Sequence, residues 1–199
     1  MTTSSRTASA SRSTAETSID IAIDLDGDSQ GEATTGLPFF DHMLSQLGRH
    51  GGFTLRVDAS GDLEIDAHHT VEDVGILLGS CFAEALGDKS GVRRFASISV
   101  PLDEAVVEAV VDLSGRPFLH YDVSPPGQKI LGDPPFDPQL CEEFWRAFAT
   151  SAALTLHITM IRGRNTHHII EASFKAVARA LRDAVRVEGT GIPSTKGVL

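Results

Sequence analysis

One five-residue motif occurs twice in the chain, and this repetition constrains the fold more than any other feature. The motif H-H-x-x-E occupies residues 68–72 and again residues 167–171. Two copies in 199 residues are improbable by chance, so we expect an internally duplicated domain. On a helix the first His and the Glu share a face, whereas the second His points about 100° away. Each copy can therefore supply ligands to two different centres.

The residue types in the motif indicate a metal ion. Imidazole combined with carboxylate suits Mn, Fe, Co or Zn, whereas Ca and Mg prefer oxygen ligands alone. The competing interpretation is a pair of solvated helix starts, where a Glu in the first turn is favoured by the helix dipole. A single H-H pair favours that second interpretation, but the duplication favours the metal.

Composition and charge restrict the class of protein. The chain is 41% hydrophobic and 22% charged, which is typical of a globular domain. A net charge of −10 disfavours nucleic acid as a partner. Two cysteines and no apolar run of membrane-spanning length predict a reduced, cytoplasmic protein without a membrane partner. Residues 1–14, rich in Ser and Thr, are expected to form a disordered tail.

The order of predicted elements also repeats. Alternating apolar residues predict a strand over 17–25 and a hairpin over 53–67 that turns near residues 60–62. Helical spacing predicts helices, for example over 39–47. D-L-D-G at 24–27 matches D-L-S-G at 112–115. We therefore predict an α+β fold of two repeats, about 15–100 and 101–188. Each repeat has a four-stranded, mostly antiparallel sheet and two helices, with the helices packed between the two sheets.

The repeat suggests how the ligands divide. A constant offset of 101 places His42 opposite Glu143 on equivalent helices, although Glu143 is also explained as a solvated acid beside Glu142. A symmetric arrangement gives two ions with four protein ligands each, which leaves two octahedral positions open. The first set is His68, Glu72, Glu143 and His168, and the second is His42, His69, His167 and Glu171. Arg94, Arg116 and Lys196, taken alone, indicate only surface charge.

Several motifs resemble one enzyme family. They are F-F-D-H-M-L at 39–44, D-A-H-H-T-V-E-D at 66–73, V-D-L-S-G-R-P at 111–117, H-H-I-I-E-A-S-F-K-A at 167–176 and P-S-T-K-G at 193–197. From about Thr14 to the C-terminus the sequence resembles imidazoleglycerol-phosphate dehydratases. The resemblance implies dehydration of D-erythro-imidazole-glycerol phosphate to imidazole-acetol phosphate in histidine biosynthesis. It also implies two Mn ions per active site and a shell of 24 subunits with active sites between subunits.

The resemblance further implies residue roles. The family's metal ligands map onto the same two sets, except that many relatives carry His where this chain has Glu143. Its acid/base glutamate maps onto Glu16, and Glu171 or a metal-bound water is the alternative base. Its phosphate-binding residues map onto Gln46, Arg94, Arg116, Ser194 and Lys196, so residues 189–199 are expected to form a substrate-binding tail.

The chemistry explains the need for metal. The carbon that loses a proton has no neighbouring carbonyl, so the imidazole ring is the only electron sink. A metal-bound imidazolate is expected to expel the hydroxyl through a diazafulvene-like intermediate. Two alternatives remain open: a metal-dependent structural or storage homo-oligomer, and a metallohydrolase of phosphate esters, which would release free phosphate.

Overall fold

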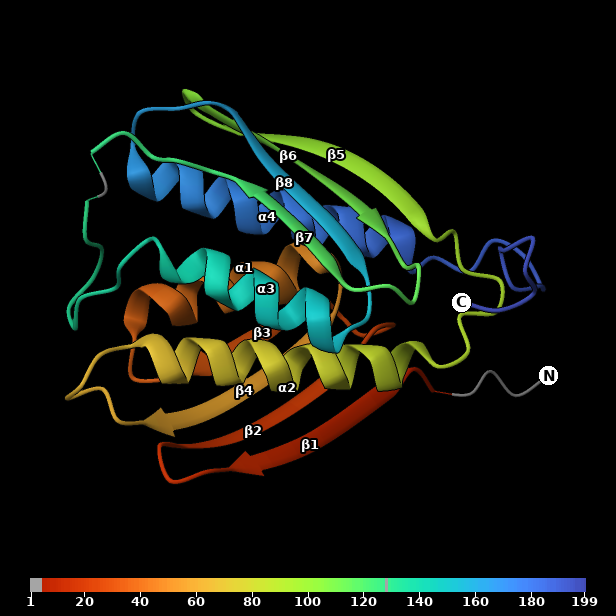
Figure 1. Cartoon of the computed structure of the whole chain (residues 1–199), viewed down its shortest axis with the longest axis horizontal. Helices are drawn as coiled ribbons and strands as arrows, with labels where there is room; N and C mark the ends of the chain where they lie inside the picture. Colours follow the sequence, from red (N-terminus) through yellow and green to blue (C-terminus); the bar gives the residue numbers. More distant parts are fainter. Residues whose placement is uncertain (1–4, 128) are drawn as a thin grey trace.

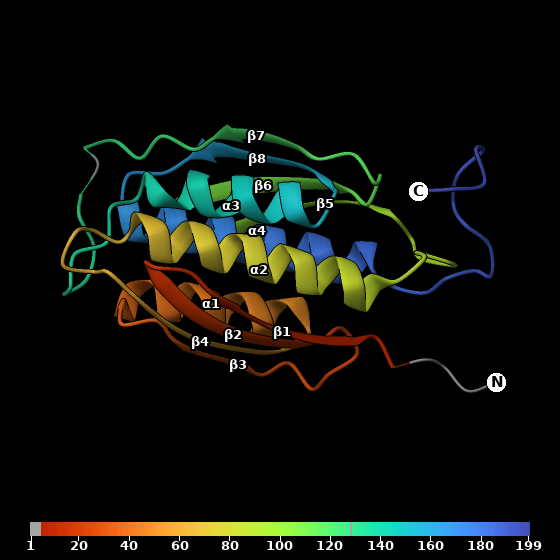
Figure 2. The same cartoon turned by 60° about the horizontal axis from the view of Figure 1, so that its bottom comes forward.

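The computed structural model describes residues 5–127 and 129–199. Two sheets form its outer layers and helices lie between them, as Figures 1 and 2 show from two sides. The first half contains β1 (Thr7–Ser13), β2 (Thr17–Asp24), β3 (Gly31–Thr34), α1 (Pro38–Gly51), β4 (Thr54–Gly61) and α2 (His68–Leu86). The second half contains β5 (Phe95–Leu102), β6 (Ala105–Asp112), β7 (Phe118–Asp122), α3 (Leu140–Ser151), β8 (Thr155–Arg162) and α4 (Thr166–Ala184).

The two sheets have the same topology. Their strand orders are β1-β2-β4-β3 and β5-β6-β8-β7. In each sheet the first two pairings are antiparallel, and the last strand, β3 or β7, runs parallel to its neighbour. The predicted duplicated α+β fold, with helices between two mostly antiparallel sheets, is confirmed.

Local sequence explains where the helices of the site begin and end. Pro38 occupies the start of α1, and Gly52 ends that helix with φ of 75°, a left-handed conformation that glycine adopts without a steric penalty. At the start of α4 the Asn165 side chain accepts hydrogen bonds from the backbone N–H groups of His167 and His168. This cap fixes the second H-H pair at the helix N-terminus.

The helices pair across the two halves. α1 packs against α4, and α2 packs against α3. Glycines permit the second contact, because a Cβ at Gly75 would lie 2.7 Å from the Phe144 carbonyl oxygen, and one at Gly79 would lie 2.6 Å from that of Phe148. All four helices begin at the same end of the molecule (Figures 1 and 2). Side chains from both halves can therefore meet at that end.

The prediction of a disordered tail over residues 1–14 is wrong for residues 7–13, which form β1. Seven residues of β1 pair in unbroken register with β2. Ala8 is buried and Ala10 packs against the core, while the intervening side chains are polar. Apolar and polar residues thus alternate as in a strand. The apolar residues are alanines, however, so the composition of the stretch resembles that of a disordered segment. Residues 1–4 of the predicted tail lie outside the described residues.

Two further predictions need correction. The boundary between the repeats, placed at residues 100 and 101, falls inside β5, which pairs with β6. The structural halves meet instead in the connection over residues 87–94. The alternating residues 62–66, predicted to return as a strand after β4, contain no strand, and β1 takes the fourth place in the first sheet.

Candidate active site

α1 and α4 bring three potential metal ligands together. Among the described residues, the only group of three or more His, Cys, Asp or Glu side chains placed to hold an ion is His42, His167 and Glu171, whose ligand atoms lie within 4.8 Å of one another. Glu171 Oε2 lies 2.9 Å from His167 Nε2 and 3.5 Å from His42 Nε2. Two imidazoles and a carboxylate are a donor set that suits a borderline divalent ion such as Mn.

The surroundings of Glu171 hold this group in place. The Phe39 ring packs edge-on against His167, with centroids 5.3 Å apart. The Glu171 side chain is only 12% exposed, and its other oxygen lies 2.6 Å from Lys175 Nζ. Burial by itself raises the pKa of Glu171, but Lys175, His167 and His42 together outweigh burial and lower the pKa below its ordinary value. The cluster therefore contains an ionised carboxylate at neutral pH.

The equivalent residues on α2 and α3 do not form such a group within the chain. His68 Nε2 lies 3.8 Å from Glu72 Oε2, and the Glu72 side chain is 46% exposed. Glu143 instead faces Arg146, whose Nε lies 3.8 Å from its carboxylate. Both side chains of this contact are solvent-exposed, so it leaves Glu143 free to reorient, and the ligand role of Glu143 stays a prediction.

The second His of each motif binds a carboxylate rather than the cluster. His69 Nδ1 lies 2.9 Å from Asp62, and His168 Nδ1 lies 2.8 Å from Glu104. The hydrogen bond to Asp62 raises the pKa of His69 above its ordinary value. The hydrogen bond to His168, followed by backbone N–H donors, lowers the pKa of Glu104 to about 2. Sequence reasoning missed both acids.

Glu16 lies beside His69, in the turn between β1 and β2. Its Oε2 is 3.8 Å from His69 Nδ1, and its side chain is 53% exposed. A hydrogen bond attaches this turn to α2, because Thr17 Oγ1 donates to the buried Asp73 carboxylate at 2.6 Å. Thr14 Oγ1 accepts from the Glu16 backbone N–H at 3.1 Å. The chain therefore fixes the backbone of Glu16 and leaves its carboxylate accessible.

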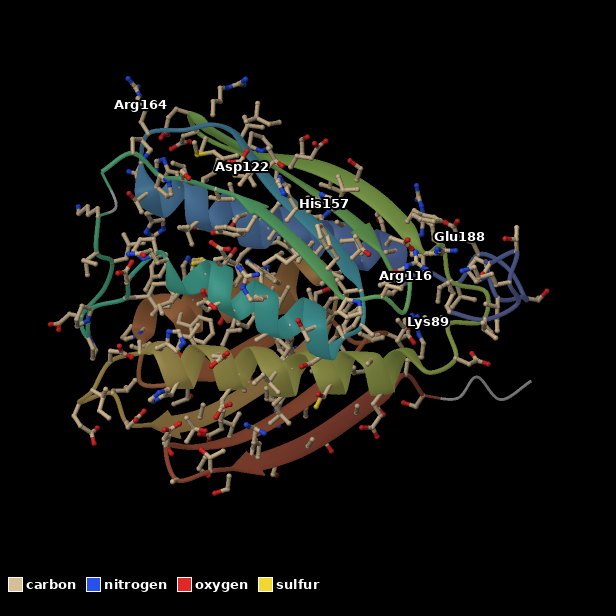
Figure 3. The ribbon with its side chains drawn as sticks, in the orientation of Figure 1. Lys89, Arg116, Asp122, His157, Arg164 and Glu188 are labelled. Carbon is tan, nitrogen blue, oxygen red and sulfur yellow. The ribbon has the colours of Figure 1, made fainter. Side chains whose placement is uncertain are left out.

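Four of the five predicted phosphate-binding residues line one pocket at the opposite end of the molecule: Arg94, Arg116, Ser194 and Lys196. Arg94 donates to Asp112 at 2.7 Å and to the Pro193 carbonyl at 2.8 Å, which ties the C-terminal tail to the second sheet. Figure 3 shows Arg116 near this tail, with Arg164 far away beside the start of α4. Gln46 is not in the pocket, because it lies on α1 and is hydrogen-bonded to His50 at 3.0 Å.

The length of α4 separates these two regions. The Arg94 backbone N–H donates to the carbonyl of Ala184, the last residue of α4, whereas His167 lies at its start. At 1.5 Å per residue the two points are about 25 Å apart. A small phosphate ester cannot contact the histidine cluster and the arginine pocket of the same chain at once.

Comparison with known proteins identifies the family. The sequence model of imidazoleglycerol-phosphate dehydratase matches residues 35–181. The chain belongs to the imidazoleglycerol-phosphate dehydratase family. It is 54% identical to the dehydratase of Frankia casuarinae, over 98% of this chain and 99% of that one. It is 57% identical to the dehydratase of Gluconacetobacter diazotrophicus, over 98% of both chains.

Solved structures of imidazoleglycerol-phosphate dehydratases have the same fold. The Staphylococcus aureus enzyme is 40% identical and superposes with a TM-score of 0.81, covering 91% of this chain and 99% of that one. The Pyrococcus furiosus enzyme is 36% identical, with a TM-score of 0.79 and coverage of 96% and 100%. The predicted family and hydro-lyase function are thereby confirmed. No described helix of this family member is long and apolar enough to cross a bilayer.

Proposed function

We propose that this chain dehydrates imidazoleglycerol phosphate to imidazole-acetol phosphate at a centre of two Mn ions located where copies of the chain meet. The observation that carries the metal proposal is the group formed by His42, His167 and Glu171 at the start of α1 and α4. Its nitrogen and oxygen donors suit Mn, and three ligands leave coordination positions for substrate and for donors from elsewhere.

The chain's own residues would divide the work at this end as follows. The two imidazoles and Glu171 Oε2 hold an ion, while Lys175 binds the other Glu171 oxygen and so orients the carboxylate. Phe39 restricts the His167 ring. When bound, the metal ions polarise the substrate's imidazole ring and so increase its capacity to accept electrons.

Glu16 is the residue best placed to move protons on the substrate side chain. Its carboxylate is exposed beside His69, and its backbone is fixed by the anchored turn. A carboxylate with these properties can take a proton from carbon and return one to the departing hydroxyl, which leaves as water. Glu171 is less suited, because its two oxygens already contact His167 and Lys175.

The substrate's phosphate would be bound by a neighbouring copy. Arg94, Arg116, Ser194 and Lys196 offer the cations and hydroxyl that a phosphate dianion needs, but on their own chain they lie about 25 Å from the cluster. Gln46 lies one helical turn from His42, where it can meet the phosphate that a neighbour's pocket holds. The active site thus requires a homo-oligomer, and the family resemblance makes a 24-subunit assembly our proposal.

The proposal is tested by product analysis of metal-depleted and Mn-reconstituted protein. We expect imidazole-acetol phosphate only after Mn is restored, with the phosphate group retained in the product. Release of inorganic phosphate, or full turnover without a divalent ion, would contradict the proposal. His157→Ala, on the outer face of β8, provides a control that should behave as the unchanged protein.

A further inference from the structure

Glu104 lies in the turn between β5 and β6, and both of its carboxylate oxygens have hydrogen-bond partners. Its Oε1 accepts hydrogen bonds from the backbone N–H groups of Asn165 at 2.7 Å and Arg164 at 3.1 Å. Its Oε2 lies 2.8 Å from His168 Nδ1. One carboxylate therefore binds two backbone N–H groups of the loop before α4 and the side chain of His168, the second His of the second H-H-x-x-E motif.

This geometry determines which imidazole nitrogen carries the proton. An ionised carboxylate only accepts hydrogen bonds, so Nδ1 of His168 must donate to it. In the neutral ring Nε2 then carries the lone pair. Nε2 lies 3.9 Å from Asp103, beyond hydrogen-bonding distance, so nothing in the turn competes for that lone pair.

The duplication gives this arrangement a counterpart. Aligning D-L-D-G at 24–27 with D-L-S-G at 112–115 places Glu104 opposite Glu16, each just before the second strand of its sheet. In the first half, however, Asp62 is the acid that binds His69, at 2.9 Å, and Glu16 remains at 3.8 Å. Asp62 Oδ2 is therefore placed at His69 as Glu104 is placed at His168, and the Glu16 carboxylate remains exposed.

We propose that Glu104 is a positioning residue that holds His168 as its Nδ1–H tautomer and presents Nε2 as a metal ligand, and that Asp62 does the same for His69. The inference rests on the proposed metal-dependent function. Partners of this kind around metal-bound histidines affect metal affinity about 10–100-fold.

The test compares Mn affinity in metal-depleted full-length protein, by titration followed with electron paramagnetic resonance. Glu104→Gln retains an oxygen for the backbone N–H groups but turns an amide N–H₂ toward His168, which favours the opposite tautomer. We expect Mn binding about 10–100-fold weaker at one site per subunit. The metal-free variant should remain folded but melt at a lower temperature, because the ionised Glu104 carboxylate stabilises the native state through its three hydrogen bonds. Glu108→Gln, on the outer side of β6 where Glu108 contacts Ser97, is the matched control and should bind Mn normally.

The outcomes separate this inference from the proposed function. If the unchanged protein binds no Mn, the metal centre itself is wrong and this inference is overturned with it. If the unchanged protein binds Mn and Glu104→Gln binds it equally tightly, only the positioning role is overturned. Should Glu104→Gln unfold, Asp62→Asn decides, because an equal Mn affinity in that variant would contradict the shared role of the two acids.

Discussion

The α1–α4 and α2–α3 helix pairs descend from the same duplicated plan, yet only the first assembles its ligands within the chain. In α1–α4, the Glu171 side chain is only 12% exposed and its carboxylate contacts both Lys175 and His167. The Phe39 ring packs against His167. In α2–α3, Glu72 is half exposed. The equivalent of His42 there is Glu143, which faces its own helix's Arg146. The H-H-x-x-E motif thus supplies potential ligands, but burial and neighbouring charges decide whether they converge.

The largest effect is expected from removing a ligand of the assembled group. His167→Ala deletes one of its two imidazoles, so activity should fall by at least about 100-fold, since even outer partners of metal ligands contribute 10–100-fold. Turnover assays and metal content per subunit measure this loss. Full activity with full metal content would show that the α1–α4 cluster is not the centre.

A smaller effect is expected from replacing Glu143 in the α2–α3 pair, where the ligands do not converge within the chain. If Glu143 becomes a ligand when copies of the chain meet, Glu143→Ala should weaken Mn binding by at least about 10-fold at one of the two sites and leave the other site unchanged. Glu143→His should retain that site. Glu142→Ala, which removes the neighbouring acid on the same helix, is the control. Identical titrations of the Glu143→Ala and Glu142→Ala proteins would assign Glu143 to the solvated surface instead.

The smallest effect concerns stability. Lys175→Met removes the cation beside partly buried Glu171 and should lower the free energy of unfolding of metal-free protein by about 1–2 kcal/mol at pH 7. The folded pKa of Glu171 lies below its ordinary value of 4.5. Its contribution is therefore present above that value and is lost as the pH falls through the folded pKa.

Denaturant unfolding at pH 7 and at about pH 4 should consequently show the difference between Lys175→Met and the unchanged protein shrinking toward the acid. The comparison variant is Arg146→Met on α3, whose ion pairs are solvent-exposed. Its unfolding free energy should change by less than about 0.5 kcal/mol. If both variants lost the same unfolding free energy, the Lys175–Glu171 pair would be no more stabilising than the exposed ion pairs of α3, which would contradict the proposed difference between the helix pairs.

Features that depend on periodicity and repetition, such as strands, helices and the duplicated motif, could be predicted from the sequence. The alternation of Ile19, Ile21 and Ile23 predicts β2. The symmetric division of ligands into two sets groups His42 with His167, 125 residues away, as the structure does. β1 was missed because Ala8 and Ala10 give alternation without hydrophobicity. Asp62 and Glu104 were missed because turns, which carry no periodic signal, bring them to the histidines.

The incomplete ligand sets have a different cause. His68, Glu72 and the arginine pocket are all present in one chain, but a single copy keeps the pocket about 25 Å from the cluster. Under the proposed function a second copy of the chain supplies the missing contacts, and patterns within one sequence cannot show such contacts.

Mixing two inactive variants tests the shared site most directly. His167→Ala damages the cluster, and Arg116→Ala damages the pocket with an exposed side chain whose loss leaves the core intact. After co-expression, about a quarter of the sites should combine an intact cluster from one subunit with an intact pocket from another, so activity should return. Mixed assemblies that contain both variants and remain inactive would contradict an active site formed between subunits.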